Sequence, residues 1–465
     1  MTLGLPDDAR VRLREDVTLD GCLLSGGSPH RVARLSQRAV AMFHCREVLV
    51  DSPASRALAE RLIDLNLAYP LTGSLPEAPE LTVVIPVRGR VRALDRLLRN
   101  LGAELPVIVV DDASDDPAAL CEVTRRHGAS IIHLPDNVGP AQARNIGLAR
   151  VRTPVVAFID SDVTARAGDL RDLARHFADP QLALIAPRVR GITSGGAPTW
   201  FQSYEEAVSS LDLADKPSTV RPWSALSWLP SACLLARVDD IGDGFDPALR
   251  VAEDVDLVWR TITAGKRARY EPTIQVTHDA RAMLTSWLAR KTYYGTGAAP
   301  LAQRHGDLVA PAVLTPAPTI AILALAVQRR WSFLLAIAAL ATIWLRTHRS
   351  LPTGTRRRRH ASKLTALGVL STAAQLSELA IRHAWPVTAL ACTISRPARR
   401  WVAMMTVVDA ALTFQRHRPD LDPVRFALAR RLDDAAYGLG VWTGAWRART
   451  LRPLIPRWHM TGRSR

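Results

Sequence analysis

Short apolar runs alternate with amphipathic helical stretches through the middle of the chain. Residues 81–87, 107–110, 131–134 and 155–159 are mostly apolar. Apolar runs without regular polar alternation are typical of strands buried on both faces of a parallel sheet. An amphipathic helix is predicted over 91–101, between the first two of these strands. Strands that alternate with helices predict an α/β, Rossmann-like fold with a mostly parallel sheet and helices on both faces.

Acidic residues gather where the predicted strands end. Asp111 and Asp112 follow the second strand, and Asp160 and Asp162 follow the fourth. In parallel α/β sheets, the carboxyl ends of the strands form the edge where ligands bind. Hard divalent cations prefer carboxylate oxygens together with substrate phosphates. The pattern therefore predicts a site for a metal and a phosphorylated ligand, although Asp at a strand end is also typical of a turn.

Two predicted helix starts and one further strand carry other polar candidates. Arg144 and Asn145 lie in a Pro-Ala-Gln-Ala-Arg-Asn segment that follows the third strand. Glu253 and Asp254 begin a later helix. Acidic residues in a first helical turn are favoured by the helix dipole, so capping alone is the alternative explanation for this pair. His278 follows a short strand, where a structural role is the more common one.

As a set, these segments resemble the inverting GT-A glycosyltransferases of family 2, over roughly residues 81–278. The resemblance implies a GT-A type sheet and transfer of a hexose from a nucleotide sugar. It implies that Asp162 and His278 hold a divalent metal, Mg or Mn, and that Asp254 is the general base for the acceptor hydroxyl. It also implies a set of residues that contact the nucleotide sugar: Pro86, Asp111, Asp112, Arg144, Asn145, Asp160 and Glu253.

The chain departs from the processive members of this family in one respect. It lacks their Gln-x-x-Arg-Trp motif, and residues 287–297 instead combine Trp, Tyr, Arg and Lys. This departure argues against synthesis of a long polymer through a channel. Addition of a few sugars remains compatible with it.

The order of the segments along the whole chain resembles the mycofactocin-system glycosyltransferases. That resemblance implies transfer of glucose from UDP-glucose onto a peptide-derived redox cofactor, which builds a short β-linked glucose chain. A membrane-associated glycosyltransferase of envelope polysaccharide or lipid synthesis is the alternative enzyme. A non-catalytic scaffold that retains the nucleotide-binding fold is the alternative from another class.

A small α+β module is predicted ahead of the transferase core. Short strands are expected over 11–16, 23–29 and 32–35, and helices from Ser36 and over 55–66. The arrangement resembles the winged-helix, PqqD-like peptide-recognition domains. The resemblance implies a module that presents the peptide-derived acceptor, and an ordinary packing domain is the alternative.

The chain after the transferase core is first hydrophobic. Residues 308–327 and 331–345 contain no charged side chain. The first run is long enough to span a bilayer, although its prolines disfavour a straight helix. Three arrangements remain open: a membrane hairpin, helices half-buried in one leaflet, or a core helix pair.

The formal net charge of +16 lies entirely in the last part of the chain. Residues 346–465 contain 22 Lys and Arg against 6 Asp and Glu, whereas the preceding residues balance. Arginines interspersed with tryptophans suit an anionic membrane surface. We therefore expect membrane association with the basic tail in the cytoplasm. Nucleic acid is not expected as a partner, because the chain contains no recognised nucleic-acid-binding module.

Five widely spaced cysteines predict neither a metal site nor a disulfide framework. The first residues show no signal-peptide pattern. Both observations favour the cytoplasm, at the inner face of the cell membrane. Together the patterns predict five segments: the module (1–70), a linker (71–80), a GT-A domain (81–305), a hydrophobic helical pair (306–346) and a basic helical region (347–465).

Overall fold

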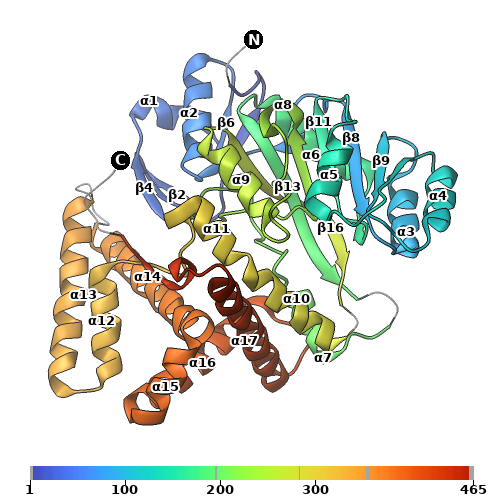
Figure 1. Ribbon diagram of the computed structural model, residues 1–465. Coiled ribbons are helices and arrows are strands. Elements are labelled where there is room, and N and C mark those ends of the chain that lie inside the picture. Colours follow the sequence, from blue (N-terminus) through green and yellow to red (C-terminus); the bar gives the residue numbers. More distant parts are fainter. Residues whose placement is uncertain (1–3, 194–195, 282, 352–356, 460–465) are drawn as a thin grey trace. The chain divides into compact units, whose positions relative to one another are not determined.

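The computed structural model describes residues 4–193, 196–281, 283–351 and 357–459. The chain forms two compact units (Figure 1). The first contains Met1–Gly196 and Val208–Ala280, and the second contains Ala197–Ala207 and Arg281–Arg465. The predicted module and most of the predicted GT-A domain therefore share one unit, and that unit ends at Ala280.

A nine-stranded sheet forms the centre of the first unit, in the order β10-β9-β8-β11-β15-β13-β16-β12, with β14 paired to β16. Strands β10, β9, β8 and β11 are parallel, as predicted for the four apolar runs. Strand β15 is antiparallel to both of its neighbours, so the complete sheet is mixed. The strands are β8 (Leu81–Val87), β9 (Val107–Asp111), β10 (Ser130–His133), β11 (Val155–Ile159), β12 (Val163–Thr164), β13 (Leu182–Ile192), β14 (Ser218–Thr219), β15 (Cys233–Arg237) and β16 (Arg267–Asp279).

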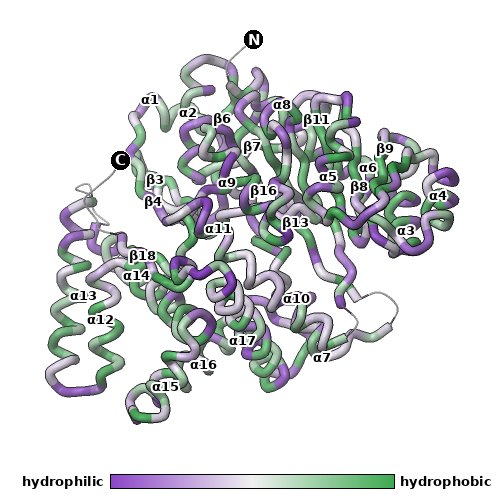
Figure 2. Tube along the Cα trace, in the orientation of Figure 1, coloured by the Kyte–Doolittle hydropathy of each residue, from purple (hydrophilic) through white to green (hydrophobic). Residues whose placement is uncertain are grey.

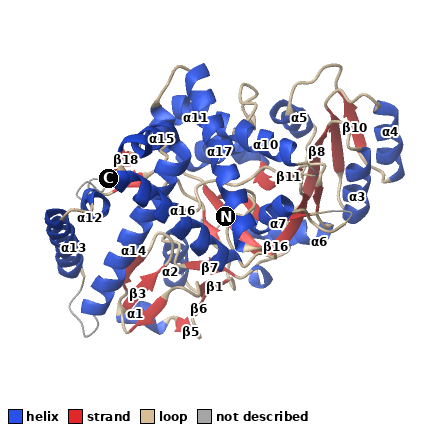
Figure 3. Cartoon of the chain, turned by 90° about the horizontal axis from the view of Figure 1, so that it is seen from below, coloured by secondary structure: helices blue, strands red, loops and turns tan. Residues whose placement is uncertain are grey.

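Helices cover both faces of this sheet (Figure 3). Helices α3 (Val91–Leu101), α4 (Pro117–Arg126) and α6 (Ala167–Arg175) share one buried core with alternate residues of the strands. Helix α5 (Pro140–Leu148) packs against the opposite face of the sheet. It lies so close to β8 that a Cβ atom at Gly147 would collide with the Val84 side chain. The other helical segments of this part are η2 (His176–Ala178), α8 (Val238–Ile241) and α9 (Glu253–Thr263).

The N-terminal module has a hydrophobic core of its own, formed around Leu13, Val48 and Leu62. It contains two small antiparallel sheets, β5-β6-β1-β7 and β2-β3-β4. The backbone N–H of Thr219 donates a hydrogen bond to the Asn66 side chain over 3.0 Å, which ties the module to the large sheet. Its elements are β1 (Arg10–Leu13), β2 (Thr18–Asp20), β3 (Leu23–Gly26), β4 (Arg31–Arg34), α1 (Gln37–Ala41), β5 (Phe43–His44), β6 (Glu47–Leu49), α2 (Pro53–Asp64), β7 (Ala68–Pro70) and η1 (Thr72–Ser74).

The second unit is almost entirely helical. Helix α7 follows β13 in the chain but belongs to the second unit. Its Glu205 accepts a hydrogen bond from the Trp287 indole (2.7 Å) and pairs with Lys291 (2.9 Å), which attaches the helix to that unit. The elements are α7 (Trp200–Ala207), α10 (Leu284–Thr296), α11 (Ala298–His305), η3 (Gly306–Leu308), β17 (Val313–Leu314), α12 (Pro316–Val327), α13 (Arg330–Ser350), α14 (Arg357–Glu378), η4 (Leu379–His383), α15 (Trp385–Ile394), α16 (Arg396–His417), α17 (Pro423–Arg447), η5 (Arg452–Leu454) and β18 (Arg457–Trp458).

The two charge-free runs become the helices α12 and α13. The first of these helices begins only at Pro316, well inside its apolar run. Proline is tolerated in the first turn of a helix and breaks the turns before it, which explains the late start. Helix α13 contains the whole of the second run, residues 331–345.

Candidate active site

Two acidic residues lie at the carboxyl end of β9: Asp111 is its last residue, and Asp112, which follows it, organises the start of α5. Both oxygens of the Asp112 carboxylate accept hydrogen bonds from the loop before that helix. The donors are the Asn137 side chain (2.7 Å) and the backbone N–H groups of Val138 (2.7 Å) and Gly139 (2.9 Å). Asp112 therefore holds the loop that leads into the segment containing Arg144.

Asp111 is buried at the end of β9 and faces a histidine. Its carboxylate accepts a hydrogen bond from the backbone N–H of Ser114 (3.0 Å) and lies 2.8 Å from Nδ1 of His133, at the end of β10. Pro86 lies on the adjacent strand, opposite Val110. The predicted nucleotide contacts Asp111 and Pro86 therefore lie on neighbouring strands, near their carboxyl ends.

A buried arginine bridges two of the predicted carboxylates. Arg144 donates from Nη1 to Glu253 (2.9 Å) and from Nη2 to Asp160 (2.5 Å). Its guanidinium also lies over the Phe245 ring, 5.2 Å from the centroid. Burial opposes the charge of Arg144, but the two carboxylates outweigh it and raise its pKa above the ordinary value. This bridge joins α5, the end of β11 and the start of α9.

Asn145, the neighbour of Arg144, forms hydrogen bonds to the backbone of Phe245 with both polar atoms of its side-chain amide. Its Nδ2 donates to the carbonyl oxygen of Phe245 (2.6 Å), and its Oδ1 accepts from the N–H of the same residue (2.9 Å). The amide thereby holds the ring of Phe245 near Arg144. The structure thus engages both polar atoms of Asn145 within the protein.

Asp254 lies beside the arginine bridge, in the first turn of α9. Its carboxylate accepts hydrogen bonds from the backbone N–H groups of Ser231 (3.3 Å) and Val255 (2.8 Å), and the side chain is only partly buried. Desolvation and the adjacent negative charge of Glu253 raise the pKa of Asp254 to about 7. A carboxyl group with this pKa is suited to accept a proton near neutral pH.

The turn before β15 brings Asp254 close to the end of β11. Ser231 donates to Asp254, and the next residue, Ala232, accepts a hydrogen bond from the N–H of Asp160 over 3.0 Å. Asp162 is two residues beyond Asp160 in the same turn. Carboxylates from β11 and α9 therefore converge on one region of the first unit.

Asp162 and His278 meet because β12 pairs with β16. Val163 lies opposite His278 in the antiparallel register, and the two side chains approach to 3.4 Å between Oδ1 of Asp162 and Nε2 of His278. The other oxygen, Oδ2, forms an ion pair with Arg90. Asp162 is buried, whereas the Arg90 side chain is 38% exposed.

The Asp162 and His278 side chains fit a metal ion that is held partly by the protein and partly by the phosphates of a substrate. Within the described residues, no group of three or more His, Cys, Asp and Glu side chains is arranged to hold a metal ion alone. Mg²⁺ is usually held by one or two carboxylates together with substrate phosphates. Asp162, with His278 beside it, offers such a partial set, and the cationic Arg90 at Oδ2 marks where positive charge is favourable.

Two side chains and one backbone group of this region were not among the predicted site residues: the Arg90 and His133 side chains and the backbone N–H of Ser231. Arg90 and His133 each lie at or just after the carboxyl end of a predicted strand, which is a signal that the sequence contains. Ser231 acts through its backbone N–H, for which no residue-type signal exists.

Comparison with known proteins gives the following matches. The family model described as Glycosyl transferase family 2 matches residues 82–222. The pre-mycofactocin glycosyltransferase of Mycobacterium tuberculosis is 38% identical over 465 residues, which cover 97% of this chain and 98% of that protein. The succinoglycan biosynthesis protein ExoO of Rhizobium meliloti is 28% identical and covers 45% of this chain and 63% of its own length.

A solved structure of a mannosyltransferase from Pyrobaculum calidifontis, in complex with GDP-Man and Mn²⁺, is also similar. It is 20% identical, covers 72% of this chain and 87% of its own, and superposes with a TM-score of 0.38.

Proposed function

This chain belongs to the family 2 glycosyltransferases and is a glycosyltransferase of the mycofactocin system, and from this premise we propose its donor, acceptor and stereochemistry. We propose that it moves glucose from UDP-glucose, with inversion, onto a peptide-derived redox cofactor. The product is a short chain of β-linked glucose units. The observation that carries the proposal is Asp254, a partly buried carboxyl group with a raised pKa beside the Arg144 bridge.

The proposed reaction is a single displacement. The acceptor hydroxyl attacks the anomeric carbon of the sugar, the bond from that carbon to the diphosphate breaks, and the proton of the hydroxyl passes to Asp254. Two N–H donors orient the Asp254 carboxylate for this role. A divalent metal bound through Asp162 and His278 would supply positive charge for the departing diphosphate. Attack opposite the leaving group inverts the configuration.

The N-terminal module is the proposed binding site for the peptide part of the acceptor. It shares the compact unit that contains the catalytic residues. Its small sheet has the order β2-β3-β4, so among the described strands β4 pairs with β3 alone. An unpaired strand edge can bind an extended peptide through backbone hydrogen bonds. This arrangement supports a module that brings the acceptor to the transferase.

The purified chain, incubated with UDP- and GDP-sugars, Mg²⁺ or Mn²⁺ and the peptide-derived acceptor, tests this function. We expect UDP-glucose to be consumed only when the acceptor is present, and mass spectrometry to find hexose units added to the acceptor. Transfer to a lipid or polysaccharide instead would support the alternative enzyme of envelope synthesis and contradict the proposed acceptor.

Membrane docking through the second unit is also part of the proposal. Many apolar side chains of α12–α16 are exposed, and green predominates along α12 and α13 in Figure 2. Helix α13 and residues Arg357–His383 are long and apolar enough to cross a membrane, and 17% of each apolar window is buried. The exposed apolar surface of the second unit includes Ile320, Leu323, Leu334, Ile337, Leu370, Leu390, Ile394, Val407 and Leu412.

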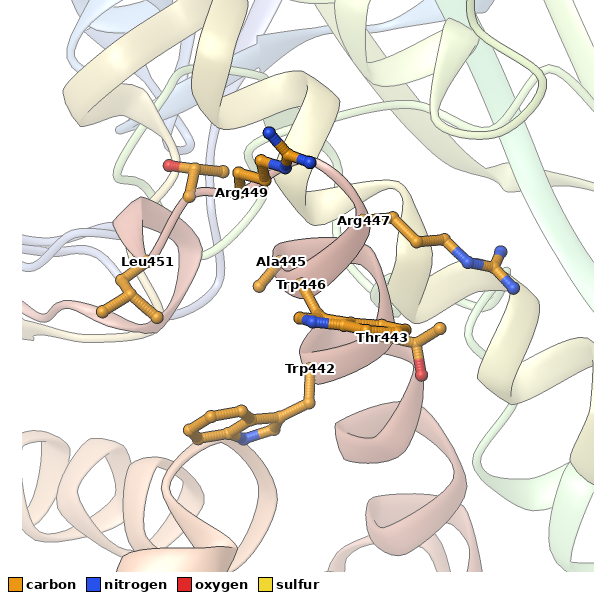
Figure 4. A pocket seen from close by; sticks show the side chains of 8 residues that line it. Trp442, Thr443, Ala445, Trp446, Arg447, Arg449 and Leu451 are labelled. Atoms are coloured by element: carbon orange, nitrogen blue, oxygen red, sulfur yellow. The ribbon is translucent and has the colours of Figure 1, made fainter.

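Aromatic and basic side chains accompany this surface at the end of α17. Trp442 and Trp446 line an open cavity of about 770 Å³ together with Arg447, Arg449 and Leu451 (Figure 4). Trp446 as a whole residue is 81% exposed. Indole rings beside guanidinium groups suit the boundary between lipid headgroups and acyl chains. We therefore assign an anionic lipid bilayer, at the inner face of the cell membrane, to this surface.

Flotation with vesicles that contain phosphatidylglycerol tests the docking surface. We expect the wild-type chain to float with the vesicles and a variant with Ile337→Asp and Leu390→Asp to lose at least roughly 100-fold in affinity, since each buried apolar side chain is worth about 1.5–3 kcal/mol. Leu49→Asp, at an exposed apolar position of the first unit, is the matched control and should float normally. A wild-type chain that does not float would refute the docking surface.

A further inference from the structure

Arg90 occupies one oxygen of the carboxylate that is proposed to hold the metal. Its guanidinium forms an ion pair with Oδ2 of Asp162, while His278 faces Oδ1 of the same group over 3.4 Å. Asp162 is buried and Arg90 is partly exposed. The carboxylate is thus fixed in the protein, and the cation that neutralises it comes from a more accessible side chain.

The backbone around Arg90 forms a tight turn directly after β8. Gly89 (φ 65°) and Arg90 (φ 49°) both have left-handed conformations, and Arg90 precedes the first residue of α3. The long Arg90 side chain has several rotatable bonds, so its guanidinium can change partners while this turn stays in place. Arg96, an arginine within α3, pairs with Asp279, the residue after His278. That pair keeps α3 attached to this edge of the sheet when Arg90 changes its partner.

The same turn is tied to the acidic segment after β9. The N–H of Gly89 donates to the Ser114 hydroxyl over 2.7 Å, and the N–H of Ser114 donates to Asp111 over 3.0 Å. Asp111 is a proposed nucleotide contact. The turn that places Arg90 beside the Asp162 carboxylate is therefore joined, through Ser114, to the part of the site that would bind the nucleotide.

A guanidinium and a metal ion compete for Asp162. Without a donor, Arg90 neutralises the carboxylate from Oδ2, so a metal that binds through Oδ1 and His278 meets a like charge and is held weakly until the guanidinium leaves. When a nucleotide diphosphate arrives with the metal, it adds negative charge beside Asp162, and that charge attracts the released guanidinium. Arginine matches phosphate oxygens with two parallel donors, so the diphosphate is a favourable new partner.

We propose that Arg90 is an exchangeable counter-cation: it pairs with Asp162 before the donor binds, and it pairs with the diphosphate of the donor once metal and nucleotide are bound. This inference rests on the proposed metal-dependent transfer and adds a diphosphate-binding residue to it. The consequence is a positive coupling between metal and nucleotide. Because coupling is reciprocal, each ligand tightens the binding of the other by the same factor.

Arg90→Ala tests both proposed roles of Arg90, because it removes the guanidinium from Asp162 and from the diphosphate. Removal of the competing guanidinium should tighten Mn²⁺ binding to the nucleotide-free protein by roughly two- to fivefold, in line with the small free energy of a partly exposed ion pair. Loss of a diphosphate contact should weaken UDP binding in the presence of Mn²⁺ by about tenfold or more. Both affinities are measurable without turnover, by electron paramagnetic resonance of Mn²⁺ and by calorimetry with UDP.

Arg88→Ala is the matched control, because Arg88 is an exposed arginine of the same turn and should leave both affinities unchanged. Arg90→Lys should retain part of the coupling. Unchanged or weaker Mn²⁺ binding in nucleotide-free Arg90→Ala, with a wild-type melting curve, would overturn the proposal. Sugar transfer by the wild-type chain without any metal would also overturn it, yet would leave the proposed transferase function intact.

Discussion

Asp254→Asn is expected to lower kcat by about 10²–10⁴-fold, the usual contribution of a general base. The amide has nearly the same shape, but its single oxygen can accept from only one of the two N–H groups, Ser231 or Val255, which bond to different oxygens of the Asp254 carboxylate. It cannot take the proton of the acceptor hydroxyl. Binding of UDP with Mn²⁺ should stay within about twofold of wild type, because the proposed role of Asp254 is toward the acceptor hydroxyl rather than the nucleotide.

The control for this variant is Asp239→Asn. Asp239 is an exposed carboxylate in the first turn of α8, so this substitution removes a charge from a similar local position. We expect it to leave kcat unchanged. If Asp254→Asn retained full turnover, the general base would lie elsewhere. If neither wild type nor variant transferred sugar while both bound UDP, the chain would be a binding scaffold rather than an enzyme.

The pH dependence gives a second, independent readout of Asp254. Its pKa is raised to about 7, so the carboxyl group is protonated and inactive as a base at lower pH. The value of kcat/KM should therefore rise about tenfold per pH unit below 7 and level off above it, since this parameter reports groups of the free enzyme. A profile that is flat between pH 5 and 8 would contradict this assignment.

Arg144→Met is expected to destabilise the first unit by about 3–5 kcal/mol, because it leaves the carboxylates of Asp160 and Glu253 without their buried cation. Methionine has a similar length, so the main change is the loss of charge and of hydrogen bonds. The melting temperature should fall by roughly 6–20 °C for a unit of this size. Differential scanning calorimetry of the full chain measures this change.

Two further variants isolate the cause. Arg99→Met removes an arginine whose ion pair with Asp95 lies at the surface, and it should cost less than about 1 kcal/mol. A triple variant that adds Asp160→Asn and Glu253→Gln to Arg144→Met should recover most of the lost stability and remain inactive. Equal melting temperatures for Arg144→Met and wild type would show that the ion pairs of Arg144 do not contribute the expected free energy of unfolding.

The apolar runs predicted the four parallel strands and the helix over 91–101 closely. Strand β11 begins and ends at residues 155 and 159, as predicted, and α3 spans 91–101. A buried strand must be apolar along its length, so its signal is contained in neighbouring residues. The antiparallel direction of β15 was not predicted, because strand direction depends on how distant segments return to the sheet.

In the site, too, features formed by residues close together in the sequence were predictable, and contacts between distant residues were not. The clusters after β9 and β11 were visible in the sequence because each lies within a few residues of a strand end. The partners of those carboxylates were not. Arg144 and Glu253 are 109 positions apart, and Arg90 and Asp162 are 72 positions apart. No local pattern records which cation neutralises which carboxylate.

Residue order alone was sufficient to indicate an α/β sheet, its acidic strand ends and a hydrophobic, basic tail, because these features arise from interactions between near neighbours. The transferase activity was implied by the resemblance to a known family. Folding was needed to bring Asp162 beside His278, to place Arg144 between two carboxylates and to desolvate Asp254. Those pairings depend on strand register and on charge at short range through the protein interior. They are properties of segments that meet only when the chain is folded.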